Sequence, residues 1–225
     1  MLNEIKTGIL LQGRVSDWTI PIIEELQVNF PNSEIVLSTW TSDDITGIPC
    51  KVIQSDLPKP TQPYKNTKDH QIIGCQNGLK EMKSDIILRC RSDQFIHNPN
   101  IFKIFLAEKS NDKIMYSSLG VWNEIFRDYW IADFCQLSSK ETLLNFWNSM
   151  PLFDGRYEIA SEIYFTRNYI LKFKKDYRPW KITQKEYFIS KNFHDDFQIE
   201  WEKVAKPGEY QKALVDNYRG IHSIP

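Results

Sequence analysis

The chain has 225 residues, of which 41% are hydrophobic and 25% charged, and its formal net charge is −1 at pH 7. This length fits one domain, and the nearly neutral charge argues against binding to a nucleic acid polymer. The start lacks a long apolar signal sequence and no apolar run approaches a transmembrane span. We therefore expect a cytoplasmic protein, with peripheral association with a membrane left open. The four scattered cysteines also fit a reducing compartment.

The first part of the chain alternates between apolar runs and amphipathic segments. The pattern predicts strands at residues 5–12, 34–39 and 50–54, and helices at residues 19–30 and 66–83. Residues 57–64 contain three prolines, which indicates a loop and a candidate wall of a site. The alternation predicts an α/β fold with a mostly parallel, Rossmann-like sheet flanked by helices.

The stretch from Asp85 to Asp93 changes character along its length. Ile86 begins an apolar run typical of a strand buried on both faces, but Arg89, Arg91 and Asp93 crowd its end. Buried Arg or Asp is costly unless it is paired, and ligands of open α/β sheets bind beyond the carboxyl ends of strands. Two interpretations are open: the rim of a ligand site, or a structural ion pair that caps the strand.

Three predicted strand ends share this edge of the sheet. They carry Gln12-Gly13-Arg14, Thr39-Trp40 and Arg91-Ser92-Asp93. Gly13 permits a tight turn and close approach of the backbone to a ligand, and Trp40 is a candidate border for a nucleobase. The edge is therefore the predicted position of a site.

The alternation weakens after residue 118. Asn98-Pro99 predicts the start of a helix that ends near residue 108, and residues 113–117, 131–137 and 185–190 have strand character. Ser138 and Glu141 form a candidate capping box. Further helices are predicted at residues 156–174 and 209–218, with His194 in a polar loop. We expect a single domain with a nucleotide-sugar-binding half, residues 1–118, and a less regular acceptor-side half and tail, residues 119–225.

A nucleotide-binding half followed by a less regular half is the plan of a transferase that uses an activated nucleotide donor. The chain has neither Gly-x-x-x-x-Gly-Lys-Ser/Thr nor Gly-x-Gly-x-x-Gly, which argues against P-loop enzymes and dinucleotide dehydrogenases. Arg14, Arg89 and Arg91 are candidate partners for an anion, with Lys65 or Lys68 as a further candidate. Asp93 could supply a carboxylate to Mg²⁺ or Mn²⁺, which often take only one or two from the protein. Metal and arginine together would stabilise a departing diphosphate.

An ordered set of short segments resembles the WavE-type lipopolysaccharide-synthesis family, which is similar to a branch of the GT-A glycosyltransferases. The segments are Gln12-Gly13, Ser38-Thr39-Trp40, the predicted helix containing Asn77-Gly78-Leu79, and Leu88-Arg89-Cys90-Arg91-Ser92-Asp93. The second half matches more loosely, through Asp133 and Ala160-Ser161-Glu162. The resemblance implies a nucleotide-sugar donor, a glycan or glycolipid acceptor, and Mn²⁺ or Mg²⁺ at the Arg-Ser-Asp turn.

With the strand ends, the resemblance defines the candidate donor-binding residues: Gln12, Gly13, Arg14, Thr39, Trp40, His70, Arg91, Ser92 and Asp93. The chain departs from the family pattern at two positions. Arg91 stands where the first Asp of Asp-x-Asp is expected, and His70 stands where an Arg is expected. Arg91 could itself balance the diphosphate charge, so strict metal dependence is left open. Asp93 and His194 are the candidate metal ligands.

For the catalytic base, the resemblance points to Glu162. Inverting GT-A enzymes use an Asp or Glu near the start of an acceptor-side helix to remove the proton of the acceptor hydroxyl. Glu158 and Glu162 are four residues apart, so a solvated helix face is an alternative explanation. Asp133, on a predicted strand, and Asp154, in a predicted turn, are the next candidate bases. The predicted activity is sugar transfer from a nucleotide sugar to a glycan or glycolipid by direct displacement. A nucleotidyltransferase of sugar phosphates and a non-catalytic glycan-binding domain are the alternatives.

Overall fold

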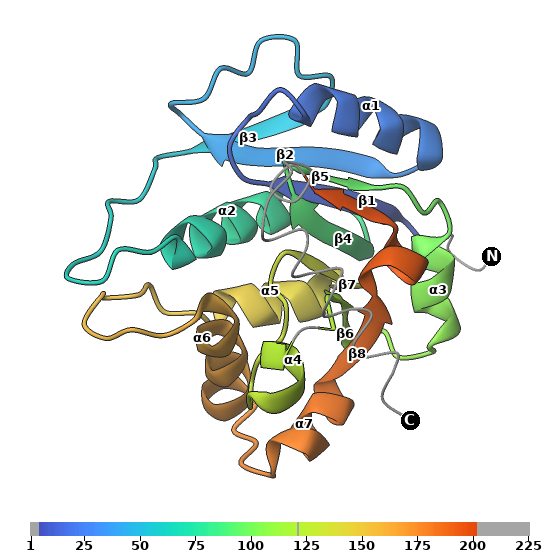
Figure 1. The fold of residues 1–225 in the computed structure, drawn as a ribbon. Helices are drawn as coiled ribbons and strands as arrows, with labels where there is room; N and C mark the ends of the chain where they lie inside the picture. Colours follow the sequence, from blue (N-terminus) through green and yellow to red (C-terminus); the bar gives the residue numbers. More distant parts are fainter. Residues whose placement is uncertain (1–4, 121, 202–225) are drawn as a thin grey trace.

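The computed structural model describes residues 5–120 and 122–201, which form a seven-stranded sheet flanked by helices (Figure 1). The sheet order is β3-β2-β1-β4-β7-β6-β8, and β5 and β9 form a separate antiparallel pair. The strands are β1 (Thr7–Gln12), β2 (Glu34–Trp40), β3 (Lys51–Ser55), β4 (Ile86–Arg91), β5 (Gln94–Ile96), β6 (Ile114–Ser118), β7 (Cys135–Ser139), β8 (Phe188–Asn192) and β9 (Ile199–Trp201).

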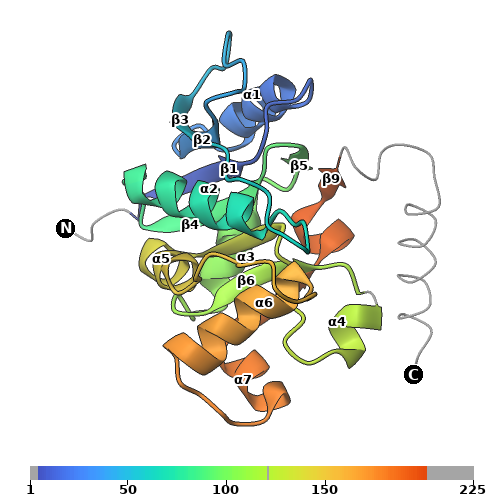
Figure 2. The ribbon, with the colours of Figure 1, turned by 90° about the vertical axis from the view of Figure 1, so that its left-hand side faces the viewer.

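The helices lie on both faces of this sheet (Figures 1 and 2). The α-helices are α1 (Thr19–Asn29), α2 (Lys68–Glu81), α3 (Ile101–Ala107), α4 (Trp122–Phe126), α5 (Lys140–Asn148), α6 (Ser161–Arg167) and α7 (Trp180–Tyr187). The π-helical segments are η1 (Asn168–Phe173) and η2 (Phe193–Phe197). The connections through α1 and α2 cross the sheet in opposite directions, so right-handed crossovers place these helices on opposite faces.

The predicted α/β fold with a mostly parallel sheet is confirmed. Strands β3, β2, β1 and β4 are parallel, whereas β7 is antiparallel to both of its neighbours. Gln12 is paired with Ser38 on one side and with Arg91 on the other, so the carboxyl ends of three strands meet at one edge. This register creates the shared edge that the sequence predicts.

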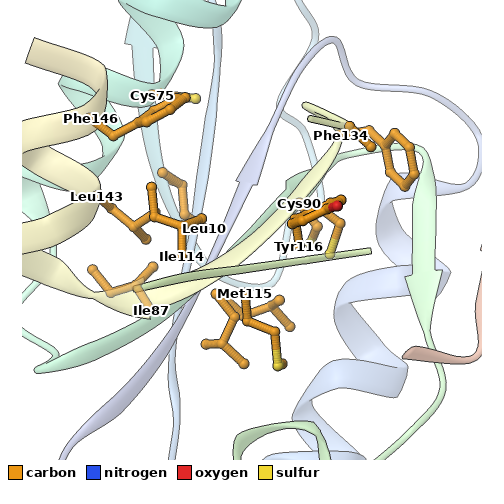
Figure 3. Close-up of a cluster of buried hydrophobic side chains, with 14 of the residues drawn as sticks. Leu10, Cys75, Ile87, Cys90, Ile114, Met115, Tyr116, Phe134, Leu143 and Phe146 are labelled. Atoms are coloured by element: carbon orange, nitrogen blue, oxygen red, sulfur yellow. The ribbon is translucent and has the colours of Figure 1, made fainter. Parts of the chain in front are cut away.

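The core fills the space between the sheet and its helices. In Figure 3, Leu10 and Ile87 of the central strands lie near Leu143 and Phe146 of α5, and all four are buried. Aliphatic strand residues pack against one aliphatic and one aromatic helix residue here, and burying such side chains is the main favourable term in folding. The core includes strands from both predicted halves of the chain, because β7 lies between β4 and β6. The division into donor and acceptor halves stays a prediction about function.

Several predicted boundaries were wrong in the second half. The residue that caps α5 is Ser139, whose hydroxyl oxygen accepts a hydrogen bond from the amide of Thr142. Ser138 belongs to β7, and its hydroxyl donates to the carbonyl of Lys113. The prediction of Ser138 as the capping residue was therefore wrong by one position, because the adjacent Ser139 caps the helix. The strand predicted at residues 131–137 begins only at Cys135.

Three further elements begin later in the chain than predicted. The helix predicted at residues 156–174 begins at Ser161 and continues as η1 after Arg167. The strand predicted at residues 185–190 begins at Phe188, because α7 continues to that point. The helix near Asn98-Pro99 begins at Ile101. The helix predicted at residues 209–218 lies outside the described residues. Within the described ranges, every helix is too short or too polar to cross a bilayer.

Candidate active site

The three strand ends and the first turns of α2 border a cavity of about 500 Å³. Eight of the nine predicted donor-binding residues line it: Gln12, Gly13, Arg14, Trp40, His70, Arg91, Ser92 and Asp93. Leu57, from the proline-rich loop predicted as a wall, also lines the cavity, as does Gln71, which the sequence did not single out. The lining residues at the strand ends lie together because parallel strands with this register bring their carboxyl ends to one edge.

Gly13 and Ser92 hold the ends of β1 and β4 against each other. Gly13 has φ +145°, and a Cβ atom there would lie 2.5 Å from the Ser92 hydroxyl oxygen. That hydroxyl donates a hydrogen bond to the carbonyl of Arg14 at 2.6 Å, and the amide of Ser92 donates to Gln12. Glycine is therefore required both by the backbone conformation and by the close approach. The turn leaves Arg14 at the cavity wall.

Arg91 and Asp93 form a bidentate ion pair at the cavity. The guanidinium Nε donates to Oδ1 and Nη2 donates to Oδ2, both at 2.8 Å. The side chains are 38% and 18% exposed, and the guanidinium lies 5.3 Å from the centre of the Trp201 ring on β9. The Arg-Ser-Asp turn therefore contains an ion pair at the end of the strand, and the same two residues also line the cavity. The interpretation as a structural cap and the interpretation as the rim of a site each describe part of this arrangement.

Trp40 and His70 form an aromatic corner of the cavity. Their ring centroids are 5.5 Å apart with an edge-to-face geometry. Burial lowers the pKa of His70, and the positive charge of Arg14 lowers it further. The lowered pKa favours the neutral imidazole, and His70 with the largely buried Trp40 ring forms an aromatic wall of the cavity.

Two predicted residues lie behind the cavity wall. Thr39 is fully buried and its hydroxyl donates to the carboxylate of Asp43, which also accepts from the amide of Val15. Arg89, predicted as an anion partner, is also fully buried and does not line the cavity. These side chains support neighbouring segments rather than face the cavity.

The Arg89 guanidinium orders two side chains of the cavity wall. Its Nη2 donates to Oε1 of Gln12 at 2.8 Å and to Oε1 of Gln71 at 3.1 Å, and Nη1 donates to the carbonyl of Asp133. The guanidinium also lies over the ring of Trp147, 5.0 Å from its centroid. A buried arginine with these partners fixes which way each amide points.

Gln71 connects the cavity to a second group of charged residues. Its Nε2 donates to Oδ2 of Asp133 at 2.8 Å. Asp133 lies in the connection that precedes β7, not on a strand as predicted. Lys68, one turn before Gln71, is buried, with its ammonium 4.4 Å from the centroid of the Phe153 ring. The first turns of α2 thus contribute to the cavity and to this group.

Glu162 lies in the first turn of α6 and interacts electrostatically with Asp133 and Lys68. Burial, together with the carboxylate of Asp133, raises the pKa of Glu162 to about 7, and the ammonium of Lys68 acts in the opposite direction. Glu158 precedes α6 and is exposed. The alternative of a solvated helix face with Glu158 and Glu162 one turn apart is therefore wrong.

The described residues do not form a built metal site. Among them, no cluster of three His, Cys, Asp or Glu side chains is placed to hold an ion. Asp93 lines the cavity, but the guanidinium of Arg91 occupies both of its oxygens. His194 lies in η2 and does not line the cavity, so the structure does not bring the two predicted ligands together there.

The fold is similar to that of solved glycosyltransferases of the GT-A type. Glucosyl-3-phosphoglycerate synthase from Mycobacterium tuberculosis, solved with Mn²⁺, UDP and phosphoglyceric acid, aligns with 99% of this chain and 80% of its own, at 12% identity and a TM-score of 0.54. The apo glycosyltransferase GlyE of Streptococcus pneumoniae TIGR4 aligns with 99% of this chain and 52% of its own, at 10% identity and 0.51. Residues 1–349 of S. aureus TarS align with 74% of this chain and 56% of their own, at 14% identity and 0.50.

The sequence matches the model of the family described as WavE lipopolysaccharide synthesis over residues 11–216, and the chain belongs to this family. Its predicted membership is thereby confirmed. No curated protein matches the sequence. The structural neighbours establish the shared fold, while the family establishes the biosynthetic context.

Proposed function

We propose that this protein is a glycosyltransferase that moves a sugar from a nucleotide-sugar donor to a glycan or glycolipid acceptor in lipopolysaccharide synthesis. The observation that carries the proposal is the cavity at the shared edge of β1, β2 and β4, which is lined by two arginines and an aromatic corner. Open α/β sheets bind ligands at this edge. The M. tuberculosis neighbour with the same fold was solved with UDP.

In the proposed complex, the cavity holds the nucleoside diphosphate. Arg14 and Arg91 supply guanidinium groups, which match phosphate oxygens in charge and geometry. The turn at Gly13 allows the backbone to approach the diphosphate, and the Trp40–His70 corner receives the base. Positive charge at the diphosphate stabilises the leaving group as its bond to the sugar breaks.

Among the described residues that line the cavity, Asp93 is the one carboxylate available to a divalent cation, and its oxygens accept hydrogen bonds from Arg91. Asp93 would be the residue that holds Mn²⁺ or Mg²⁺. Such an ion acts as a Lewis acid that stabilises diphosphate charge. Because Asp93 is the partner of Arg91, we assign the protein's own charge stabilisation to Arg91 and Arg14. Donor affinity measured with and without Mn²⁺ shows whether the ion adds to this charge.

On the acceptor side, Glu162 serves as the general base. The acceptor oxygen attacks the anomeric carbon from the face opposite the diphosphate, its proton passes to Glu162, and the bond to the diphosphate oxygen breaks. This displacement inverts the anomeric centre. A carboxylate with a pKa of about 7 suits proton abstraction near neutral pH. Asp133 remains the second candidate base.

The proposal is tested by incubating the protein with a panel of nucleotide sugars and lipopolysaccharide-derived glycans, and measuring nucleoside diphosphate release. Release that depends on the acceptor, and that Glu162→Gln suppresses, is the expected result. Pyrophosphate release from a nucleoside triphosphate would identify a nucleotidyltransferase instead. Glycan binding without turnover of any donor would identify a non-catalytic glycan-binding domain.

A further inference from the structure

A strongly basic segment runs from η1 through α7. Residues 172–186, which we call the basic tip, contain six basic and two acidic residues, although the whole chain has a net charge of −1. The basic residues are Lys172, Lys174, Lys175, Arg178, Lys181 and Lys185. In Figures 1 and 2 this segment forms one end of the described part of the molecule, opposite the end formed by α1 and β3.

The positive charge of the basic tip is only partly neutralised within the fold, by the pairing of Arg178 with Asp176. Asp176 accepts hydrogen bonds from Arg178, at 2.6 Å from Nη2, and from the hydroxyl of Tyr187 at 3.0 Å. Within residues 5–120 and 122–201, none of the five lysines forms an ion pair. The lysines therefore leave a concentrated positive field that faces solvent.

Large apolar side chains stand among these lysines. Phe173 is 43% exposed, Tyr177 76% and Ile182 48%. The turn that presents them is ordered: Lys175 has φ +53°, and the amide of Asp176 donates to the carbonyl of Ile170 at 3.1 Å. Alternation of lysines with exposed aromatic and aliphatic side chains is typical of surfaces that lie on lipid headgroups.

We propose that the basic tip binds the surface of a bilayer that contains anionic lipids. The lysines would contact headgroup phosphates, while Tyr177 and Ile182 enter the headgroup layer. A nucleic acid fits less well, because Tyr177 and Ile182 project from a tip, whereas single strands are bound in grooves lined by stacking rings. The inference goes beyond sugar transfer, and it holds or fails independently of the proposed function.

The test is co-sedimentation of the full chain with vesicles that contain no glycolipid. One set consists of phosphatidylcholine, and in the other about a third of the lipid is phosphatidylglycerol, both in about 0.1 M salt. We expect the protein to bind the anionic vesicles selectively and to be released at about 1 M salt, where charge attraction is screened. Equal binding to both vesicle sets, or to neither, overturns the proposal.

Paired charge reversals locate the surface. Lys175→Glu with Lys181→Glu should weaken binding about tenfold or more. Lys80→Glu with Lys83→Glu, at exposed positions at the end of α2 and just beyond it, changes the total charge equally and should leave binding intact. Equal losses from both pairs would mean that no local surface exists, and would overturn the proposal.

A second variant separates insertion from charge. Tyr177→Ser with Ile182→Ser keeps every lysine and should weaken binding severalfold while the preference for anionic vesicles remains. Thermal melts show whether each variant is folded. If a variant fails to fold, the binding of the wild-type chain to the anionic and the neutral vesicles alone tests the proposal. Binding of a single-stranded oligonucleotide, but of neither vesicle set, would identify a nucleic acid as the occupant and overturn the proposal.

Discussion

The carboxyl group of Glu162 lies in the first turn of α6, within the electrostatic influence of Asp133 and Lys68. If it removes the acceptor proton, Glu162→Gln should lower turnover by about 10² to 10⁴-fold. Donor affinity should be unchanged, because Glu162 does not line the donor cavity. Steady-state turnover and donor titration measure the two quantities separately.

The matched control is Glu158→Gln. Glu158 lies on the same segment but before the helix, and its side chain is exposed. This variant should behave like the wild type. Small and equal effects from both substitutions would show that the base lies elsewhere, and Asp133→Asn is then the variant to measure.

The raised pKa of Glu162 predicts opposite trends in activity and stability with pH. Turnover should rise as pH increases through about 7, because the base must be deprotonated. Stability should fall over the range from the ordinary value of 4.5 to about 7, because the folded state holds a proton that the unfolded chain releases earlier. Glu162→Gln should remove this loss. The change in the free energy of unfolding from pH 4 to pH 8 should therefore be more favourable in the variant than in the wild type by roughly 1–3 kcal/mol.

Denaturant melts of wild type and Glu162→Gln at both pH values measure the difference. The pH–rate profile of the wild type provides the companion curve. A wild-type stability difference that Glu162→Gln leaves unchanged would assign the titration to another group.

The pair formed by Arg91 and Asp93 should matter more for ligand binding than for stability. The side chains are 38% and 18% exposed, and a partly exposed pair contributes about 0–1 kcal/mol, against about 3–5 kcal/mol when one partner of a buried pair is removed. Arg91→Ala and Asp93→Ala should therefore melt nearly as the wild type does. Arg91→Ala should weaken nucleoside diphosphate binding with or without Mn²⁺, whereas Asp93→Ala should remove the part that depends on Mn²⁺. A large and matched loss of stability in both variants would make the turn a structural cap.

At the scale of elements, Arg89 joins β4 to β1, to α2 and to the connection before β7. Its guanidinium is fully buried and reaches Gln12, Gln71 and the carbonyl of Asp133. Arg89→Ala should lower the free energy of unfolding by about 3–5 kcal/mol, because it leaves a cavity and several polar groups without partners. Arg89→Met, which refills much of the volume, should lose less.

Arg156→Ala is the control for Arg89. Its side chain is 83% exposed and pairs with Asp154 on the surface, so its removal should change stability by less than about 1 kcal/mol. Urea melts of the three variants give the ranking. A loss from Arg89→Ala no larger than that from Arg156→Ala would show that the Arg89 contacts do not stabilise the fold.

Local pattern was sufficient for the elements whose own residues carry a long apolar run or a clear helical spacing. Strands β1, β2 and β4 carry continuous apolar runs, and α1 and α2 carry apolar side chains at helical spacing. The pair β5–β9 was missed, because it joins two three-residue strands, with Gln94 opposite Trp201. A short strand gains its structure from a distant partner, which local periodicity does not report.

The late start of α6 has a tertiary cause. Gly155 has φ +74°, and a Cβ atom there would lie 2.8 Å from the backbone nitrogen of Gln62. The amide of Tyr64 donates to the carbonyl of Gly155 at 3.2 Å. The segment before Ser161 is therefore held against the proline-rich loop. The apolar spacing of residues 156–174 could not show this contact.

For the whole molecule, the candidate donor cavity could be predicted because the sheet topology brings the strand ends together. The surroundings of Glu162, the candidate base, could not be predicted from the sequence. Gln71 reaches Asp133 only because α2 lies across the sheet, and Lys68 meets Phe153 only because a distant loop folds back. Trp201 covers Arg91 through the pairing of β9 with β5. Predicting these side chains requires knowing which elements pack together.

The binding of a nucleoside diphosphate tests the central claim most directly. UDP, GDP, CDP and TDP, with and without Mn²⁺, are each added at millimolar concentration while the melting temperature is measured. A ligand at a hundred times its dissociation constant stabilises by about 2.7 kcal/mol, which is roughly 5–10 °C for a chain of this size. The account predicts such a rise for at least one nucleotide, its retention in Glu162→Gln, and its loss in Arg91→Ala. No rise with any nucleotide would contradict it.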